Sequence, residues 1–487
     1  MLFNSYIFVL LFFPLVVLGY YWLHHMKQEK MALGYLTMMS MVFYGYNSIQ
    51  YLGMLIVSIL VNYLLACLMD RTGRLMLRKL FLALGLLYNL GILFCFKYYD
   101  FFIENLNTVL HADYHFLRLA LPLGISFYTF QQISYVVDSY RGDCEKYSLL
   151  EYAAYVSFFP QLIAGPIVYH DELIPRLRAE ENHHIQYENL CKGIYPFALR
   201  MAKKVLVADT LSKVVTVGYA DVNLLNNVST MLVMVCYSLQ IYFDFSGYCD
   251  MAYGIGFMFN VELPVNFNSP YKAASVREFW DRWHMTLTRF FTKYIYIPLG
   301  GSRRGKVRTY INVMLVFLVS GIWHGANWTF ILWGIINGLG NLFDRFFDRI
   351  LEKIPRVVRM IVTFCFCTIA WSMFRAESVE QGVKMIGNLA VSGDGELYGQ
   401  IAEAFSKLFE MRLLERLGMG GLMQACSWFM PVVFVLILIL VCMIMRNTQE
   451  KVNDGRYGAR RIVVTVGLLL WSVFSLSDVS EFLYFNF

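Results

Sequence analysis

The sequence predicts an all-α, polytopic membrane protein with about 10–12 spanning helices plus re-entrant or interfacial helices. Its 487 residues are 58% hydrophobic and only 16% charged, whereas soluble domains carry about 25% charged residues. Apolar runs of about 20 residues recur along the chain, each long enough to cross a bilayer as a helix. Lipid contact permits only helices or closed barrels, and runs of this length favour helices.

Basic loops predict the orientation. Two of them, at residues 24–30 and 71–79, flank the early spans. Because cytoplasmic loops are enriched in lysine and arginine, we expect the N-terminus to lie outside. Residues 6–23 lack a basic leader and a small-residue cleavage site, which indicates a first span instead of a signal peptide. The net charge of +6 is not gathered into a block, so nucleic acid is not an expected partner.

We expect one membrane domain over residues 1–487, with a core segment at 275–340. The remaining spans are predicted at 31–46, 51–69, a run ending near 96, 119–137, 193–219, 229–259, 310–330, 330–346, 357–374, 429–445 and 462–476. Prolines and glycines interrupt residues 152–168, which predicts a re-entrant or kinked pair of half-helices buried in protein. Residues 171–189 are predicted to be a solvated loop, and 376–427 an extracytoplasmic or interfacial excursion.

His324 is the first candidate for chemistry. It lies 16 positions after Arg308, which a helix converts to about 24 Å of depth. An ionisable residue at such depth indicates function, although a backbone carbonyl can also satisfy a buried histidine. Ser320, Asn327 and Trp328 are spaced to share its helical face. A neutral imidazole there can act as a general base, and no further ligands are spaced to complete a metal site.

His284 is the second candidate. Trp280, Asp281 and Thr288 follow helical spacing around it, so Asp281 can orient the imidazole or raise its pKa. The alternative is an interfacial helix whose charged side chains are merely solvated. Asp244 is an acidic residue within apolar sequence. We expect its side chain either to line a cavity or to pair with an arginine. The ten cysteines are scattered without a CxxC pair, which predicts neither disulfides nor zinc.

Four segments together resemble the membrane-bound O-acyltransferase (MBOAT) family, in particular its bacterial alginate O-acetylation branch. They are FWDRWHMTLTRFFTKYIYIPLGG (279–301), SGIWHGANWTFILWGIINGLG (320–340), FFPQLIAGPI (158–167) and FDFSGYCDMAYG (243–254). The resemblance implies helices around a central tunnel, where a cytoplasmic acyl thioester meets an acceptor from outside. It also implies that His324 and His284 are the family's two histidines, with His324 the essential one.

The resemblance further implies acetyl-CoA as donor substrate, no bound cofactor, and multi-pass residence in a bacterial cell membrane. An extracytoplasmic acetyltransferase-like partner and an exopolysaccharide or cell-wall glycan acceptor complete the expected reaction. We expect His324 to deprotonate an acceptor hydroxyl while His284 holds the thioester. Trp323 and Trp328 would line the tunnel, although packing explains them equally well. Arg303, Arg304 and Lys306 are candidates for binding the phosphates of coenzyme A, or else simple positive-inside anchors.

Two alternatives stay open from the sequence. The first is D-alanyl transfer to teichoic acid from a carrier-protein thioester, since that relative carries similar histidine motifs. The second is a non-catalytic conduit for an acyl group or glycan. Loss of transfer in a folded His324→Ala protein would favour an enzyme over a conduit.

Overall fold

The computed structural model describes residues 1–393, 396–406, 408–421, 428–445, 447, 450, 458–476 and 483. Over these residues the regular elements are helices, joined by loops and one isolated β-bridge between Phe267 and Trp283. The all-α class is therefore confirmed. The chain forms two compact units: Met1–Ala198 with Tyr248–Val265, and Leu199–Gly247 with Asn266–Phe487. The single domain expected over 1–487 stays a prediction.

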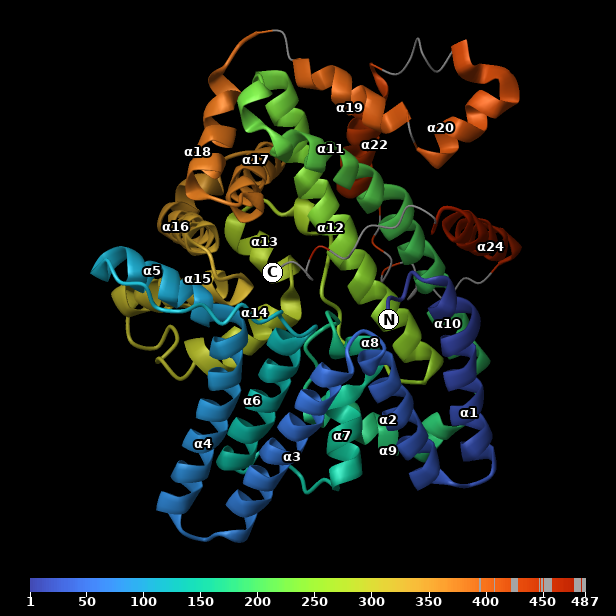
Figure 1. Ribbon diagram of the computed structural model, residues 1–487, viewed down its shortest axis with the longest axis vertical. Coiled ribbons are helices and arrows are strands. Elements are labelled where there is room, and N and C mark those ends of the chain that lie inside the picture. Colours follow the sequence, from blue (N-terminus) through green and yellow to red (C-terminus); the bar gives the residue numbers. More distant parts are fainter. Residues whose placement is uncertain are drawn as a thin grey trace. The chain divides into compact units, whose positions relative to one another are not determined.

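The first unit is built from packed helices near the N-terminus. They are α1 (Phe13–His25), α2 (Glu29–Gly45), α3 (Ile49–Arg71), α4 (Leu75–Leu93), α5 (Tyr99–Leu110), α6 (Ile125–Arg141), α7 (Leu149–Ser157), α8 (Phe159–Leu162) and α9 (His170–Arg178). Helices α3, α4 and α6 lie side by side (Figure 1). Between them, the amide of Asn62 bonds Gln132 at 2.7 Å and Asn89 at 3.3 Å. These buried amides satisfy one another where lipid and core offer no water.

The interrupted segment predicted at 152–168 is confirmed. Helix α7 ends at Ser157, α8 is a single turn carrying Pro160, and the chain then runs irregularly to α9. Every residue from 152 to 170 is buried. Non-helical backbone in a membrane protein requires such burial in protein, because lipid cannot satisfy its peptide groups.

The prediction of a solvated loop at residues 171–189 is wrong in two respects. Its first half forms α9, and His183 is buried with its ring stacked on that of His24 at a centroid distance of 4.0 Å. The Nε2 atom of His183 lies 3.2 Å from the carbonyl of Leu177. A local backbone bond and a ring partner on α1 therefore draw this polar sequence into the unit, which its composition did not indicate.

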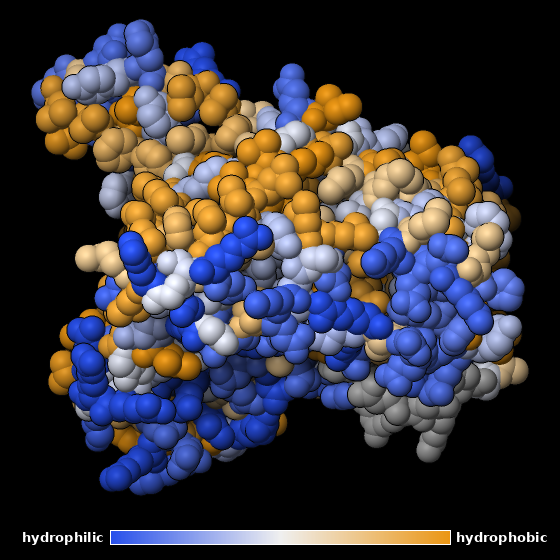
Figure 2. Space-filling view, turned by 90° about the horizontal axis from the view of Figure 1, so that it is seen from below, coloured by the Kyte–Doolittle hydropathy of each residue, from blue (hydrophilic) through white to orange (hydrophobic). Residues whose placement is uncertain are grey.

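Six helical stretches are long and apolar enough to cross a membrane in the described part of the chain. They are Phe8–His25, Ile49–Arg71, Leu75–Leu110, Asn227–Met258, Lys306–His324 and Arg356–Arg375. Large apolar side chains stand exposed on several of them, such as Leu18 and Leu87, each 70% exposed. Figure 2 shows a face on which hydrophilic residues gather beside a hydrophobic margin. The polytopic class is confirmed, whereas the total of about 10–12 spans stays a prediction.

The second unit contains the remaining helices of the described residues. They are α11 (Asp209–Ala220), α13 (Val276–Arg282), α14 (Met285–Phe291), α15 (Lys306–His324), α16 (Trp328–Leu351), α17 (Arg356–Arg375), α18 (Val379–Gly387), α19 (Glu396–Ser406), α20 (Phe409–Leu414), α22 (Met430–Ile444) and α24 (Ala459–Phe474). Two helices contribute to both units, α10 (Tyr187–Ala202) and α12 (Asn227–Met258). A π-helical turn, Lys203–Ala208, joins α10 to α11. The external placement expected for 376–427 stays a prediction.

Glycines allow α15 and α16 to pack closely. A methyl group on Gly321 would lie 2.5 Å from the carbonyl oxygen of Phe330, and one on Gly334 would lie 2.5 Å from that of Phe317. Both distances are too short for a real side chain. Small residues at a helix contact let two backbones approach, which is how membrane helices gain packing energy without a hydrophobic driving force.

Asp244 pairs with a lysine and not with the arginine considered from the sequence. Its Oδ1 lies 2.7 Å from the ammonium of Lys204, which also lies 2.8 Å from Asp209 Oδ1. All three side chains are at most 6% exposed. The other oxygen of Asp244 accepts the backbone N–H of Leu483 at 2.8 Å. The buried carboxylates are thus held by a central cation and a peptide donor, as burial of charge demands.

Candidate active site

The backbone breaks at His284. Helix α13 ends at Arg282, and His284 adopts a left-handed conformation (φ 46°, ψ 49°) before α14 begins at Met285. The loop containing Asn266 lies along this break, and its carbonyl accepts the N–H of Met285 at 3.0 Å. The continuous helical face assumed around His284 is therefore wrong, because an extended segment from upstream takes over the backbone hydrogen bonds.

Asn266 determines which nitrogen of His284 carries a proton. Its Oδ1 lies 3.2 Å from His284 Nδ1 and accepts the backbone N–H of Thr286 at 3.1 Å and the hydroxyl of Thr286 at 2.9 Å. A backbone N–H only donates, so the atom it reaches must be the amide oxygen. The His284 nitrogen facing that oxygen must then be protonated. In the neutral ring this leaves Nε2 as the basic nitrogen.

Burial keeps His284 neutral. The residue is 1% exposed, and loss of hydration lowers its pKa to about 3 from an ordinary value of 6.5. The partner at Nδ1 is thus a neutral amide, whereas the sequence pointed to the carboxylate of Asp281. A neutral acceptor fixes the orientation of the ring but does not stabilise the protonated imidazolium, whereas a carboxylate would stabilise it.

A cavity of about 350 Å³ opens beside His284. Side chains from α13, α14, α15 and α16 line it, among them Arg277, Trp280, Asp281, His284, Thr288, Ser320, Asn341 and Arg345. Arg345 lies within electrostatic range of Arg277 and Asp281, and its Nε donates to Asn341 at 2.8 Å. The cavity therefore combines an imidazole with two guanidinium groups and one carboxylate, which suits an anionic or strongly polar ligand.

His324 is the last residue of α15 and is 4% exposed. Its ring makes edge contacts with Trp323, Trp333 and Phe374 at centroid distances of 4.9, 5.0 and 5.2 Å. The helix assumed from Arg308 to His324 is confirmed by the bounds of α15. The depth of His324 in the bilayer stays a prediction.

Trp323 brings the two histidines into one cluster. Its ring lies 6.2 Å from that of His284 and 4.9 Å from that of His324, measured between centroids. Ser320, one helical turn before His324, lines the cavity that His284 also lines. The indole ring of Trp323 therefore contacts two imidazole rings: that of His324 at the end of α15, and that of His284 at the break between α13 and α14.

Asn327 and Trp328 do not continue the helical face of His324. The chain is extended at Gly325, and Asn327 caps α16 by accepting the N–H of Thr329 at 3.0 Å. Its amide nitrogen donates to the carbonyl of Glu377 at 2.9 Å. Trp328 is 52% exposed. The expected i+3 and i+4 spacing is wrong here because α15 stops at His324.

The basic loop contributes little to the cavity wall. Arg303, Arg304 and Lys306 are exposed and are absent from the cavity lining, to which the loop contributes Ser302. The cations that do line it, Arg277 and Arg345, were not singled out from the sequence. Arg277 lies near the start of the core segment and Arg345 five residues beyond its end, each next to an acidic residue, Glu278 and Asp344 respectively.

Comparisons with known proteins agree on one family. A family model described as MBOAT, membrane-bound O-acyltransferase family, matches residues 104–379. The chain is 36% identical over 521 residues to a peptidoglycan O-acetyltransferase of Helicobacter pylori, covering 100% of this chain and 98% of that protein. It is 36% identical over 409 residues to a probable alginate O-acetylase AlgI of Azotobacter vinelandii, covering 82% and 79%. A teichoic acid D-alanyltransferase of Bacillus subtilis is 23% identical over 268 residues, covering 52% and 68%.

Proposed function

Because the chain belongs to the membrane-bound O-acyltransferase family, it is an O-acyltransferase, and we propose that it serves O-acetylation of a cell-wall glycan. The similarity that supports this acceptor is the match to a peptidoglycan O-acetyltransferase over the whole chain. The similarity to a teichoic acid D-alanyltransferase covers about half the chain at 23% identity. Acetyl transfer to peptidoglycan is therefore the reaction we assign, with acetyl-CoA on the cytoplasmic side as donor.

The observation that carries the proposal is the pairing of His284 and His324 through Trp323. In the proposed step, His324 removes the proton of an acceptor hydroxyl, and the oxygen attacks the acetyl carbonyl of the thioester. The carbon–sulfur bond breaks, the coenzyme A thiol leaves with a proton, and the acetyl ester forms. General base catalysis of this kind contributes about 10²–10⁴-fold.

His284 is proposed to position the donor. Its neutral ring lines a cavity large enough for the acyl end of a thioester. A neutral imidazole can accept a hydrogen bond or hold a proton briefly without placing a fixed charge beside the reacting carbonyl. Trp323, whose ring contacts both histidine rings, is proposed to act as an apolar wall that limits access of water to the thioester.

The donor's polar portion is proposed to contact Arg277 and Arg345. Both line the cavity with His284, whereas Arg303, Arg304 and Lys306 stand outside its lining. Guanidinium groups bind phosphate oxygens with two parallel hydrogen bonds, which lysine cannot do. We retain the exposed basic loop as a positive-inside anchor with a secondary, long-range attraction for the donor.

A partner protein outside the cytoplasm is proposed to accept or complete the transfer. The N-terminus outside and residence in a bacterial cell membrane belong to the same proposal. They rest on the positions of the basic loops, and the six apolar helices support membrane insertion.

Donor choice tests the proposal most economically. The purified full chain in nanodiscs is supplied with radiolabelled acetyl-CoA or with a D-alanyl carrier-protein thioester. We expect the protein to cleave acetyl-CoA and not the D-alanyl thioester. Label should then appear on peptidoglycan fragments when a membrane extract supplies the partner. Turnover of the D-alanyl thioester in place of acetyl-CoA would replace the assignment with D-alanylation. Cleavage of neither thioester, even with the membrane extract present, would favour a conduit.

A further inference from the structure

Three polar residues recur at intervals of four along α16: Asn337, Asn341 and Arg345. Residues four apart lie one above the other on a helix, so these three form one polar face. Asn337 and Asn341 are only 2% and 5% exposed. A buried amide costs free energy unless its hydrogen-bonding groups are used. The partners of the two asparagines therefore show what this face of α16 does.

Asn337 holds the indole of Trp280. Its Oδ1 accepts the Trp280 Nε1–H at 3.2 Å, and its Nδ2 donates to the carbonyl of Trp333 at 2.9 Å. Because an indole N–H only donates and a carbonyl only accepts, the two bonds determine the orientation of the amide. Trp280 lines the cavity beside His284, whereas Asn337 is not among the described residues of that lining. Asn337 therefore acts on the cavity through the indole.

Asn341 holds the guanidinium of Arg345. Its Oδ1 accepts the Arg345 Nε–H at 2.8 Å, one turn along the same helix. Both residues line the cavity, as does Arg277, which lies within electrostatic range of Arg345. The bond to Asn341 uses one of the five N–H groups of the guanidinium. The terminal nitrogens remain to bind two oxygens of a phosphate in parallel.

The two pairs lie at different levels of α16. The eight positions from Asn337 to Arg345 correspond to about 12 Å along the helix. The level of Asn337 is next to the histidine cluster, because the ring of Trp333 contacts those of both Trp280 and His324, at centroid distances of 5.5 and 5.0 Å. This arrangement suits a ligand whose reactive end and phosphorylated end are separated by an extended arm.

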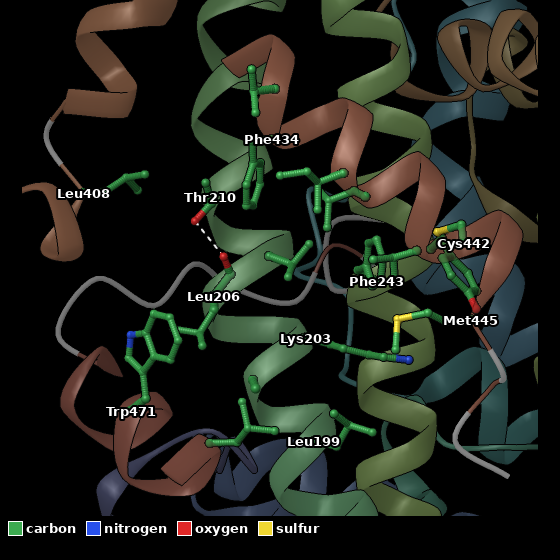
Figure 3. A pocket seen from close by; sticks show the side chains of 18 of the residues that line it. Leu199, Lys203, Leu206, Thr210, Phe243, Leu408, Phe434, Cys442, Met445 and Trp471 are labelled. Carbon is green, nitrogen blue, oxygen red and sulfur yellow. Dashed lines mark hydrogen bonds between the residues drawn. The ribbon is translucent and has the colours of Figure 1, made fainter. Parts of the chain in front are cut away.

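A larger cavity in the same unit, of about 820 Å³, is built differently (Figure 3). Leucine, valine, methionine and phenylalanine side chains dominate its wall. The hydroxyl of Thr210 is turned back to its own helix, where it donates to the carbonyl of Leu206 at 2.9 Å. Volume alone therefore does not identify the site of a phosphorylated donor, and the wall of the larger cavity offers positions for control substitutions.

We propose that the polar face of α16 divides recognition of the acyl donor between two positioning residues. Asn341 directs Arg345 to the phosphates of coenzyme A, and Asn337 directs Trp280 against the pantetheine arm that carries the thioester. The inference rests on the proposed function, in which acetyl-CoA enters this cavity. It adds two buried amides that act on the donor through neighbouring side chains.

Two donors that differ in their phosphates test this division. The full chain in nanodiscs is titrated with radiolabelled acetyl-CoA, and S-acetylpantetheine, which has the same arm and thioester but no phosphate, is measured by displacement. Asn341→Leu should weaken binding of acetyl-CoA about tenfold, the effect of one lost polar contact, and leave S-acetylpantetheine unchanged. Its KM for acetyl-CoA should rise without a change in kcat. Asn337→Leu should weaken binding of both donors.

Removing the partner of each asparagine gives a second, independent set of variants. Trp280→Phe keeps an aromatic ring but lacks the N–H that Asn337 accepts, so it should behave like Asn337→Leu. Combining these two substitutions should add little, because either one already breaks the shared bond. Arg345→Gln should reproduce Asn341→Leu. Trp471→Phe, the same substitution in the wall of the larger cavity (Figure 3), should bind both donors like wild type.

The outcomes separate this inference from the proposed function. Equal losses for the two donors in every variant would overturn the division, since general damage to the fold does not discriminate between them. Wild-type affinities throughout, or additive effects of Asn337→Leu and Trp280→Phe, would overturn the positioning roles while acetyl-CoA remains the donor. A wild-type protein that binds no acetyl-CoA would overturn the donor assignment and this inference with it. If a leucine variant does not fold, Trp280→Phe and Arg345→Gln decide the same question.

Discussion

The side-chain oxygen of Asn266 lies 3.2 Å from Nδ1 of His284 and also accepts both the N–H and the hydroxyl of Thr286. Three donors on one oxygen leave the amide a single orientation and leave the imidazole a single neutral tautomer. Asn266 is therefore a positioning residue in the proposed mechanism, because it acts on the donor through His284.

Substitutions at Asn266 test whether this residue positions His284 for catalysis. Asn266→Ala should lower kcat about 10-fold, since an unmade hydrogen bond to a buried group costs about 1–3 kcal/mol. The KM for acetyl-CoA should change little. Asn266→Asp keeps an acceptor but adds a charge that raises the pKa of His284. Its activity should then fall between pH 8 and pH 6, whereas Asn266→Ala should lose activity equally at both pH values. Identical pH profiles for the two variants would contradict the role.

The pH dependence of stability should report the burial of His284. Its pKa is about 3 in the folded protein and 6.5 when exposed, so between these values the unfolded state binds one more proton than the folded state. Stability is therefore unaffected by this group above about pH 6.5 and falls as pH drops toward 3. The Tm measured from pH 8 to pH 5 should decline less in His284→Gln than in wild type. His115→Gln, at an exposed histidine, should follow wild type, and a His284→Gln profile parallel to wild type would argue against a buried neutral ring.

Close packing of α15 on α16 should tolerate no side chain at Gly334. Gly334→Ala places a methyl group 2.5 Å from the carbonyl of Phe317, and relief of such a clash costs about 1–3 kcal/mol. We expect a lower Tm and reduced acyl transfer, because α15 carries His324. Gly53→Ala, on α3 where a methyl group meets nothing within 4 Å, is the matched control and should retain both. Full activity in Gly334→Ala would mean that the helix pair does not fix His324.

The buried cation Lys204 should be essential for folding. Lys204→Met leaves Asp209 and Asp244 without the ammonium that both contact, and removing one partner of a buried ion pair costs about 3–5 kcal/mol. Fluorescence-detected gel filtration should show loss of monodisperse protein, with partial recovery in the double variant Lys204→Met, Asp244→Asn. Lys384→Met, at an exposed lysine on α18, serves as control. A monodisperse Lys204→Met protein with wild-type Tm would contradict this account.

Long apolar runs were enough to predict the helical class and the buried interruption around Pro160, because lipid leaves the backbone few options. The ends of helices beside the histidines were harder. The sequence HGANWT contains a glycine and an asparagine that can stop one helix and cap the next, yet the apolar residues around them suggested continuous spans. Asn327 and Trp328 were consequently placed on the wrong face.

The break at His284 carried no comparable local signal. It depends on Asn266, which lies 18 positions upstream and supplies both backbone and side-chain hydrogen bonds. Arg345 likewise reaches the cavity from the far end of α16. Contacts of this kind follow from tertiary packing, so spacing within one segment suggested Asp281 as the orienting residue and the nearby basic loop as the donor site.

The catalytic assignment of His324 is tested most directly by thioester turnover. Wild type, His324→Ala and the exposed-site control His115→Ala are purified in nanodiscs and given radiolabelled acetyl-CoA with a membrane extract as the source of partner and acceptor. The account predicts that His324→Ala is folded, with a Tm close to wild type, and loses at least about 100-fold in transfer, while His115→Ala keeps full activity. A folded His324→Ala protein that transfers acetyl groups at the wild-type rate would contradict the proposed mechanism.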